Sequence, residues 1–371
     1  MRRDYSWDDK PDSVAVIPYV KPYRNRFSLD RLWGGLAYSP SVGTFGHLEL
    51  GMSDLMGNHA IGMDLGISGR IKDSNILITY LYLKHRIDYA IGVYNLFDQA
   101  IYRLARPAPE DDYYRERERE TGIYVLTRYP FSRFFRVDLD HRLYNWKYYL
   151  DHWQWNSDYS DGNWDEGIRE LDDFVYAPGL SLVYDNALYG PTGPLLGWRG
   201  IYTIRKSFAT QKMDYLTNYA DLRTYTLFNR RYALATRTIA GISTGKRPQK
   251  FDLGGYYGVR AYNGDLSGEK KLMTSIELRY PLLDYLSIAF PLPITLTSIR
   301  GSIFADLGTV WTENKHFRGI RDDKLEDIYL GYGFGPRINL GYVVLKLDVA
   351  WLTDLSRITR PTYYLSLTED F

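Results

Sequence analysis

Hydrophobic and polar residues alternate along most of the chain, most clearly at residues 271–280. One face of this expected strand would carry Leu272, Thr274, Ile276, Leu278 and Tyr280, and the other Lys271, Met273, Ser275, Glu277 and Arg279. A strand covered by a second protein layer would not place Lys, Glu and Arg in its core. A strand between lipid and a wet lumen can do so. The pattern therefore indicates the wall of a membrane barrel.

The same segregation recurs in other segments. Apolar residues alternate with Arg136, Asp138, Asp140 and Arg142, and also with Lys346 and Asp348. Charges of both signs on one face can pair across a lumen, whereas a charge on the lipid face costs about 2–4 kcal/mol at mid-membrane. About sixteen strands are expected. Their predicted starts lie near Leu32, Gly43, Ala60, Asn75, Ile87, Glu118, Arg133, Leu171, Gly197, Tyr215, Arg231, Lys271, Leu296, Ile328, Gly341 and Pro361.

The lengths of the connections separate into two groups. Short turns are expected at 129–133, 228–231 and 338–341, and long polar loops at 98–117, 151–168, 243–268 and 308–327. If strands alternate up and down, the long loops gather at one end, as in outer-membrane barrels. Two connections at the other end, 186–195 and 281–294, are longer than this rule expects. The predicted fold is an all-β, transmembrane, antiparallel up-and-down barrel, with an inward-folded loop after the eleventh strand.

Composition agrees with this interpretation. The 371 residues include 35 Tyr, 9 Trp and 15 Phe, and such amphipathic rings are favoured at bilayer interfaces. An aromatic-rich soluble sandwich would share this composition. A net charge of +1 gives no reason to expect a nucleic-acid partner. No run of about eighteen apolar residues is present, which argues against a helical membrane protein.

Residues 1–28 are predicted to form an N-terminal periplasmic segment, followed by the barrel over 29–371. The N-terminus has no apolar core or small-residue cleavage site typical of a secretory signal. An outer-membrane protein needs such a signal, so a processed chain or a C-terminal part of a longer protein is expected.

Six short motifs occur in register in the second half of the chain. They are DNALYGPTG (185–193), ADLRTYTLF (220–228), GG…VRAY (254–262), ELRYP (277–281), IFADLGTVW (303–311) and GFGPRI…LKLDVAW (333–351). Together they resemble the bacterial surface antigen superfamily. This family comprises BamA-like barrels that insert proteins into outer membranes and the transporters of two-partner secretion. The resemblance covers about 170–371 by motif, and 30–170 by strand pattern alone.

In that family the loop after the eleventh strand folds into the lumen, where its Arg pairs with acidic residues of nearby strands. The resemblance implies that Arg260 contacts Asp306, with Glu277 and Arg279 close by and Tyr262 in the same loop motif. Alternation independently places Glu277, Arg279 and Asp306 on the inward face, and a guanidinium fork suits a carboxylate there. An exposed Arg260 in a mobile loop is the alternative. The family usually has Gly where this chain has Ala261, which tolerates a positive φ less well.

The first strand, 32–39, and the last, 362–371, are predicted to form a weak lateral seam. Gly34 and Gly35 weaken strand pairing, and an opened edge is a template for an added substrate strand. The terminal Phe371 is similar to the C-terminal signal of outer-membrane proteins, although Glu369 shares the phase of Leu365. The predicted seam residues are Leu32, Gly34, Gly35, Leu36, Tyr363, Leu365, Leu367 and Phe371.

The resemblance implies an outer-membrane location in a Gram-negative-type bacterium, with both termini periplasmic. Implied partners are outer-membrane lipids, unfolded outer-membrane or secreted proteins, and periplasmic domains or accessory proteins outside this chain. Insertases of the family carry small periplasmic domains before the barrel, and residues 1–28 are too few for one. Protein insertion or translocation is therefore expected. The alternatives are an anchor or translocator for a missing N-terminal domain, and a passive diffusion pore.

Enzymatic activity, a metal site and a cofactor are not expected. The six His residues are scattered, and neither an HExxH pair nor a GxSxG elbow is present. The acidic, aromatic segment 151–166 does not have the spacing of a calcium-binding loop.

Overall fold

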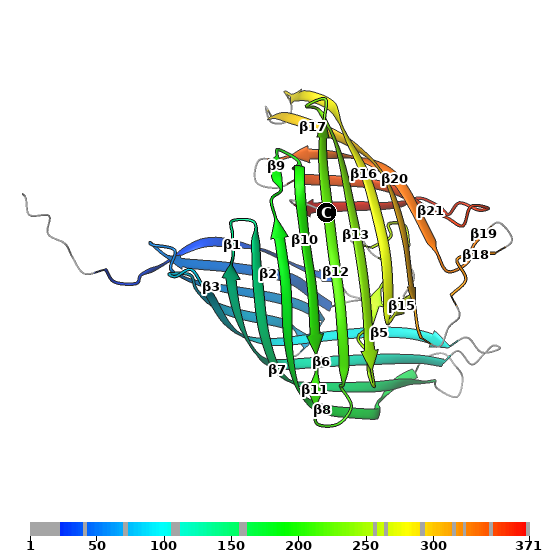
Figure 1. Cartoon of the computed structure of the whole chain (residues 1–371). Coiled ribbons are helices and arrows are strands. Elements are labelled where there is room, and N and C mark those ends of the chain that lie inside the picture. The colour runs from blue at the N-terminus through cyan, green and yellow to red at the C-terminus, as the bar shows by residue number, and fades with distance from the viewer. Residues whose placement is uncertain are drawn as a thin grey trace, which may run out of the picture.

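The structure is a computed structural model. It describes residues 23–39, 43–69, 73–104, 112–155, 162–254, 258–262, 266–289, 294–313, 317–321, 324–340 and 344–368. Long strands dominate the described residues (Figure 1). These residues include no helix that is both long and apolar enough to cross a membrane.

The long strands follow one another in chain order, and each is hydrogen-bonded in antiparallel fashion to the next. They are β1 (Phe27–Ser39), β2 (Gly43–Asp54), β3 (His59–Gly69), β4 (Asn75–Tyr82), β5 (Asp88–Leu104), β6 (Asp112–Pro130), β7 (Phe135–Trp155), β8 (Gly162–Asp185), β10 (Gly193–Lys206), β12 (Tyr215–Phe228), β13 (Tyr232–Gly245), β16 (Lys270–Ile288), β17 (Ile294–Trp311), β20 (Tyr329–Asn339), β21 (Val344–Thr353) and β22 (Thr362–Thr368). Short strands lie in the connections, namely β9 (Leu188–Gly190), β11 (Phe208–Ala209), β14 (Phe251–Asp252), β15 (Ser267–Gly268), β18 (Ile320–Arg321) and β19 (Lys324–Leu325). This order confirms the all-β, antiparallel up-and-down prediction.

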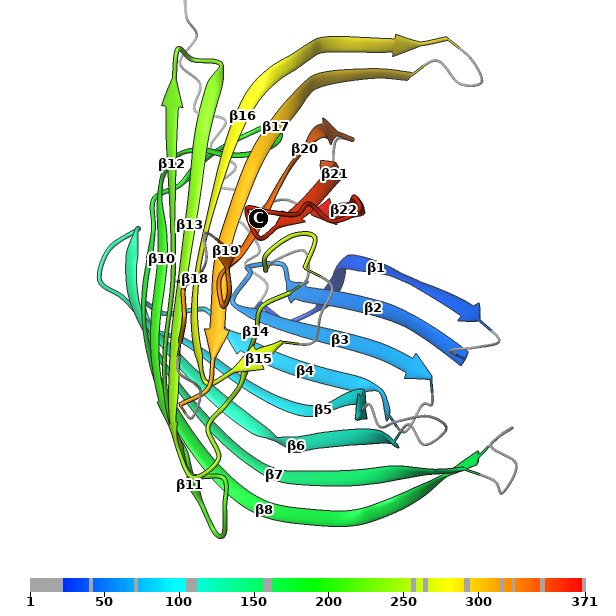
Figure 2. The same cartoon turned by 90° about the vertical axis from the view of Figure 1, so that its right-hand side faces the viewer.

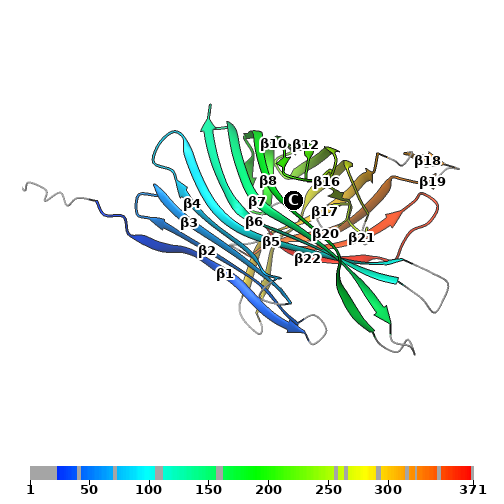
Figure 3. The same cartoon turned by 90° about the horizontal axis from the view of Figure 1, so that it is seen from below.

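The long strands form one strongly curved sheet (Figures 2 and 3). The strands β14 and β15, which belong to the connection between β13 and β16, lie on its concave side (Figure 2). Within the described residues, β1 pairs only with β2, and β22 only with β21. The sheet is therefore open, which departs from the closed barrel predicted from the sequence.

The two outer strands differ from the long inner strands of the sheet. Within the described residues the last strand, β22, has seven residues, which together offer few hydrogen bonds to a new neighbour. In β1, Gly34 and Gly35 contribute no side chain to packing and lose more conformational freedom on ordering than other residues do. A junction between these strands would be weaker than the long pairings elsewhere in the sheet.

The two faces of the sheet differ in chemistry. In β21, Lys346, Asp348 and Ala350 are buried on the concave side, whereas the alternating Leu347 is exposed. Exposed apolar side chains recur at the alternating, convex-facing positions of other strands, among them Ile123, Val125, Leu139, Leu143, Leu222, Leu272, Ile276, Ile303 and Leu307. A continuous apolar surface of this kind is unusual on a water-soluble protein and is typical of the lipid-facing wall of a barrel.

Two predicted long loops are wrong in extent. Most of 98–117 and 151–168 belongs to paired strands, because β5 continues to Leu104, β6 begins at Asp112, β7 reaches Trp155 and β8 begins at Gly162. Arg and Glu alternate over residues 115–120 of β6. Arg115 and Arg117 form ion pairs with Asp151, and Arg119 with Asp73, and the segment is hydrogen-bonded to β7, so this polar stretch is strand and not loop. The predicted connection 281–294 is largely strand as well, since β16 and β17 pair with each other there.

Candidate functional site

An apolar cluster anchors the connection between β13 and β16 on the concave face. Leu253 and Val259 of this connection are fully buried and pack with Ile239, Met273 and Val310 of the sheet. The backbone N–H of Val259 donates to the carbonyl of Leu253 at 2.9 Å, which closes the loop on itself. Burial of these side chains keeps the following residues close to the wall.

Two glycines of the wall allow the loop backbone to come this close. A Cβ at Gly331 of β20 would lie 2.2 Å from the carbonyl oxygen of Arg260. A Cβ at Gly308 of β17 would lie 2.6 Å from Cγ2 of Val259. Any larger residue at these positions would push the loop away from the sheet.

Arg260 binds Asp306 of β17 through both ends of its guanidinium fork. Its Nε donates to Oδ2 of Asp306 at 2.6 Å and its Nη2 to Oδ1 at 2.8 Å, and its backbone N–H donates to Oδ2 at 3.2 Å. The guanidinium also lies over the Phe304 ring, 3.3 Å from the centroid. Planar, charge-assisted pairing of this kind is stronger and more directional than a neutral hydrogen bond.

This pair belongs to a larger buried network. Glu277 accepts from Arg260 at 3.4 Å, from Arg279 at 2.8 Å and from Arg337 at 3.2 Å. Asp348 accepts from Arg337 at 2.6 Å and from Arg260 at 3.4 Å. We call these residues the Arg260 network; its members are Arg260, Glu277, Arg279, Asp306, Arg337 and Asp348, and none is more than 4% exposed. Three guanidinium groups balance three carboxylates, so no charge within the network is left without an opposite partner.

The tip of the loop also contacts the last strands of the sheet. The backbone N–H of Ala261 donates to the Tyr364 hydroxyl of β22 at 2.9 Å. Ala261 has a φ of 68°, a left-handed conformation that favours Gly over Ala. The Tyr262 ring packs edge-on against Tyr329 of β20, with centroids 4.7 Å apart. Tyr262 therefore belongs to the loop site through its ring packing against Tyr329.

The start of the same loop reaches strands on the other side of the sheet. Arg247 lies over the rings of Trp146 and Tyr148, with its Cζ 4.2 Å and 4.6 Å from their centroids. Its Nη2 also donates to Glu118 of β6 at 3.4 Å. The loop thus contacts β6 and β7 near one end and β22 near the other.

The predicted seam residues lie in the two outer strands, and the structure does not bring them together. Leu32, Tyr363 and Leu365 are 60%, 74% and 72% exposed. The backbone of β1 pairs with β2 from Gly34 to Leu36, and Leu367 pairs with Leu345. Phe371 lies outside the described residues.

Sequence reasoning did not assign four contributors to the loop site, namely Arg247, Arg337, Asp348 and Tyr364. Alternation already marked Asp348 as inward, but a period of two gives the face of a strand and not the level at which residues of different strands meet. Arg337 lies within the GFGPRI motif and could have been suspected from it. No signal in the sequence indicates that Arg247 or Tyr364 touches the loop site.

No group of three or more His, Asp or Glu suited to a metal ion occurs within the part of the chain that the structure describes. The carboxylates of the Arg260 network are occupied by arginines, which leaves their oxygens already hydrogen-bonded. The chemistry of this site is thus that of a structural contact between loop and wall.

Comparisons with known proteins agree with this architecture. Similar solved structures are BamA from Haemophilus ducreyi lacking POTRA domains 1–3 (TM-score 0.59, 13% identity, 93% of this chain and 69% of that chain) and CdiB from Acinetobacter baumannii (0.55, 14%, 91% and 64%). CdiB from Escherichia coli is also similar (0.55, 11%, 94% and 66%). The chain thus spans about two thirds of these proteins' length, and at these identities the likeness shows the fold.

A search of curated proteins finds no match. The profile of the Omp85 superfamily domain, however, matches residues 92–357, which is well over half of the chain. This match covers all of the Arg260 network and both wall glycines, and it ends before β22. The chain belongs to the Omp85 superfamily of outer-membrane β-barrel proteins.

Proposed function

We propose that this protein inserts or translocates other proteins at the outer membrane, using a sixteen-stranded barrel with a loop folded into its lumen. The observation that carries the proposal is the path of that loop across the concave face. It contacts β7 through Arg247, the Arg260 network in the middle and β22 through Ala261. When β1 and β22 meet in the membrane, a loop on this path lies inside the lumen.

The two outer strands supply the second part of the mechanism. Edge strands with unpaired N–H and C=O groups accept an added strand, and both β1 and β22 have a free edge within the described residues. In the bilayer these groups must be satisfied, so the edges pair with each other at rest and with a substrate strand when the seam opens. Unfolded outer-membrane or secreted proteins are the proposed substrates.

The arrangement of connections suggests an orientation. The connections at one end include the loop between β13 and β16 and the one between β17 and β20, whereas β12 and β13 are joined by a short turn at the other end. We place the long connections outside the cell and both chain termini in the periplasm. Residues 1–28 then form a periplasmic segment, and periplasmic domains or accessory proteins deliver substrate from that side.

A lateral cross-link tests the mechanism. The sequence contains no Cys, so Leu36→Cys with Leu365→Cys forms a single defined pair across the proposed seam. Oxidation should stop substrate insertion or secretion, and a reductant should restore it. The matched control is Leu347→Cys with Leu365→Cys, which joins the neighbouring strands β21 and β22 at residues already paired. Full activity of the oxidised seam pair would overturn lateral opening.

A passive diffusion pore is the second candidate, and the loop argues against it. The Arg260 network holds the loop where ions would pass, so the intact protein should show little steady conductance in planar bilayers. Stable porin-like channels would overturn the occupied lumen. A pure anchor for another domain predicts that both oxidised Cys pairs leave substrate insertion and secretion unaffected.

A further inference from the structure

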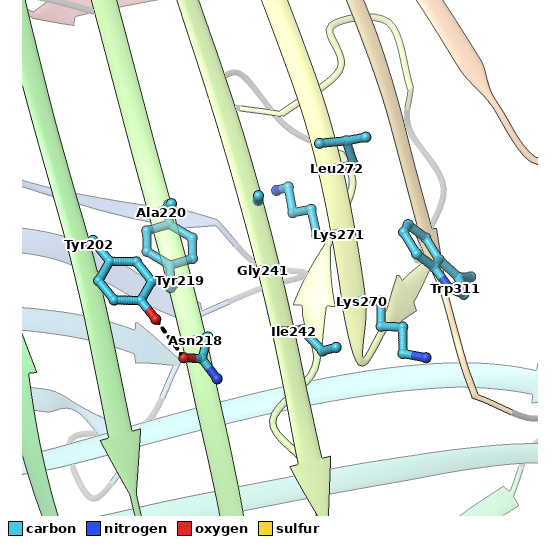
Figure 4. A pocket seen from close by; sticks show the side chains of 11 residues that line it. Tyr202, Asn218, Tyr219, Ala220, Gly241, Ile242, Lys270, Lys271, Leu272 and Trp311 are labelled. Atoms are coloured by element: carbon cyan, nitrogen blue, oxygen red, sulfur yellow. Dashed lines mark hydrogen bonds between the residues drawn. The ribbon is translucent and has the colours of Figure 1, made fainter.

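A shallow groove lies on the convex face of the sheet, opposite the loop site (Figure 4). It has a volume of about 340 Å³ and crosses β10, β12, β13, β16 and β17. The volume falls within the range of sites that hold small ligands, about 300–1,000 Å³. The groove is thus large enough to hold part of a ligand.

Register explains why the wall is hollowed here. One row of paired residues reads Tyr202, Ala220, Ala240 and Leu272 across four neighbouring strands. Two small side chains therefore lie between two large ones, which leaves a depression with a floor of methyl groups. The flanking Tyr202 and Leu272 are 43% and 49% exposed and form its walls.

The next row towards the long connections supplies the polar end of the groove. Asn218 pairs with Ile242, Ile242 with Lys270, and Lys270 with Trp311. The Tyr202 hydroxyl donates to Oδ1 of Asn218 at 2.8 Å (Figure 4). Lys270 makes no ion pair with any residue that the structure describes, so its ammonium remains available to an anion. One end of the groove is therefore apolar and the other cationic.

The groove is continuous with the apolar convex wall, where lipid acyl chains lie. Leu222 and Leu307 of that wall lie at the two ends of the row just beyond the floor, away from Lys270, with Thr238 and Thr274 between them. An acyl chain can enter sideways between the methyl groups of this row, and Trp311 and Tyr202 are aromatic residues of the kind favoured at a bilayer interface. Its headgroup then reaches the Lys270 end.

We propose that this groove binds a phosphorylated glycolipid of the outer leaflet, with one acyl chain over Ala220 and Ala240 and a phosphate at Lys270. The choice of leaflet rests on the orientation under the proposed function, in which the long connections face outwards. Charge favours an anionic lipid over a neutral one, because Lys270 is the cation at the headgroup end. A bound lipid here would pack directly against the strands whose opposite face carries the loop site.

Native mass spectrometry of the detergent-purified chain tests this proposal, with lipid A, phosphatidylglycerol or phosphatidylcholine added in turn. Lipid A should remain bound preferentially. Lys270→Gln should lower bound lipid A about fivefold through loss of one cation, and Ala240→Leu should abolish binding by filling the floor. Both changes lie on the lipid-facing wall, and heat-modifiable gel migration verifies that each variant is folded.

The matched control is Lys147→Gln. Lys147 occupies a convex-facing position of β7, but it is paired with Asp172 at 3.8 Å, so its removal should leave lipid A binding unchanged. Binding of phosphatidylglycerol as strong as that of lipid A would overturn the glycolipid assignment. Equal binding by all variants, or equal binding of phosphatidylcholine, would overturn the groove as an anionic-lipid site. The assay contains no protein substrate, so its outcome is independent of whether the seam opens.

Discussion

The Arg260 network and the two outer strands differ in how far their polar groups are buried and paired. Within the network each charged side chain has an oppositely charged partner, and Asp306 is completely buried. In the outer strands, Tyr363 and Leu365 are more than 70% exposed, and one backbone edge of each strand is unpaired within the described residues. The protein thus concentrates its strongest contacts where a loop must stay in place and keeps its weakest pairing at the sides of the sheet.

The largest expected effect comes from removing the centre of the network. Asp306→Ala leaves the Arg260 guanidinium buried without its main partner, which should lower the free energy of unfolding by about 3–5 kcal/mol. Urea unfolding in detergent measures this loss, and proteolysis within 246–269 reports release of the loop. The matched change Asp284→Ala removes the exposed partner of Arg231 and should cost below about 1 kcal/mol. Equal losses in the two variants would contradict a special role for the buried pair.

A milder substitution separates charge from geometry. Arg260→Lys keeps the positive charge but cannot form the bidentate hydrogen bonds with Asp306. The free energy of unfolding should therefore fall by about 1.5–3 kcal/mol. The same unfolding measurement applies. A variant as stable as the wild type would show that charge alone holds the loop.

The contact between loop and outer strand can be removed by itself. Tyr364→Phe deletes the hydroxyl that accepts from the Ala261 N–H, at a cost of about 1 kcal/mol. We expect faster hydrogen exchange in β22 and in the loop tip together, because the change loosens both partners. The control Tyr363→Phe removes a hydroxyl from the exposed neighbour and should leave exchange unchanged. Faster exchange in β22 alone would show that loop and edge are not coupled.

The smallest expected effect is an increase in stability. Ala261→Gly removes the strain of a left-handed backbone conformation at an Ala residue. Gly also gives the unfolded chain more conformational freedom, which offsets part of this benefit. The net free energy of unfolding should therefore increase by up to about 1 kcal/mol. Ala235→Gly, at a buried position of β13, should be destabilising instead. A loss of stability in the Ala261 variant would contradict the assignment of strain to this residue.

Much of the wall could be predicted from alternation, because lipid and lumen impose opposite chemistries on successive residues. The strands β2, β4 and β12 begin at the predicted residues, and Glu277, Arg279 and Asp306 lie on the predicted face. The extensions of β5 to β8 escaped prediction, since a polar strand in water and a polar loop share the same composition. Closure depends on whether β1 pairs with β22. Alternation of polar and apolar residues gives the face of each residue but does not say which strands pair.

The position of Arg247 lets one loop connect strands that lie far apart in the sheet. It stacks on Trp146 and Tyr148 of β7, while Ala261 of the same loop is hydrogen-bonded to β22. Between these two contacts the loop is also held by the buried side chains of Leu253 and Val259 and by the ion pair of Arg260 with Asp306, so it connects distant strands of the curved sheet. If the barrel widens as proposed, the attachment to β22 should break first, because it is a single hydrogen bond between Ala261 and Tyr364, whereas the rest of the loop is held by buried side chains and ion pairs.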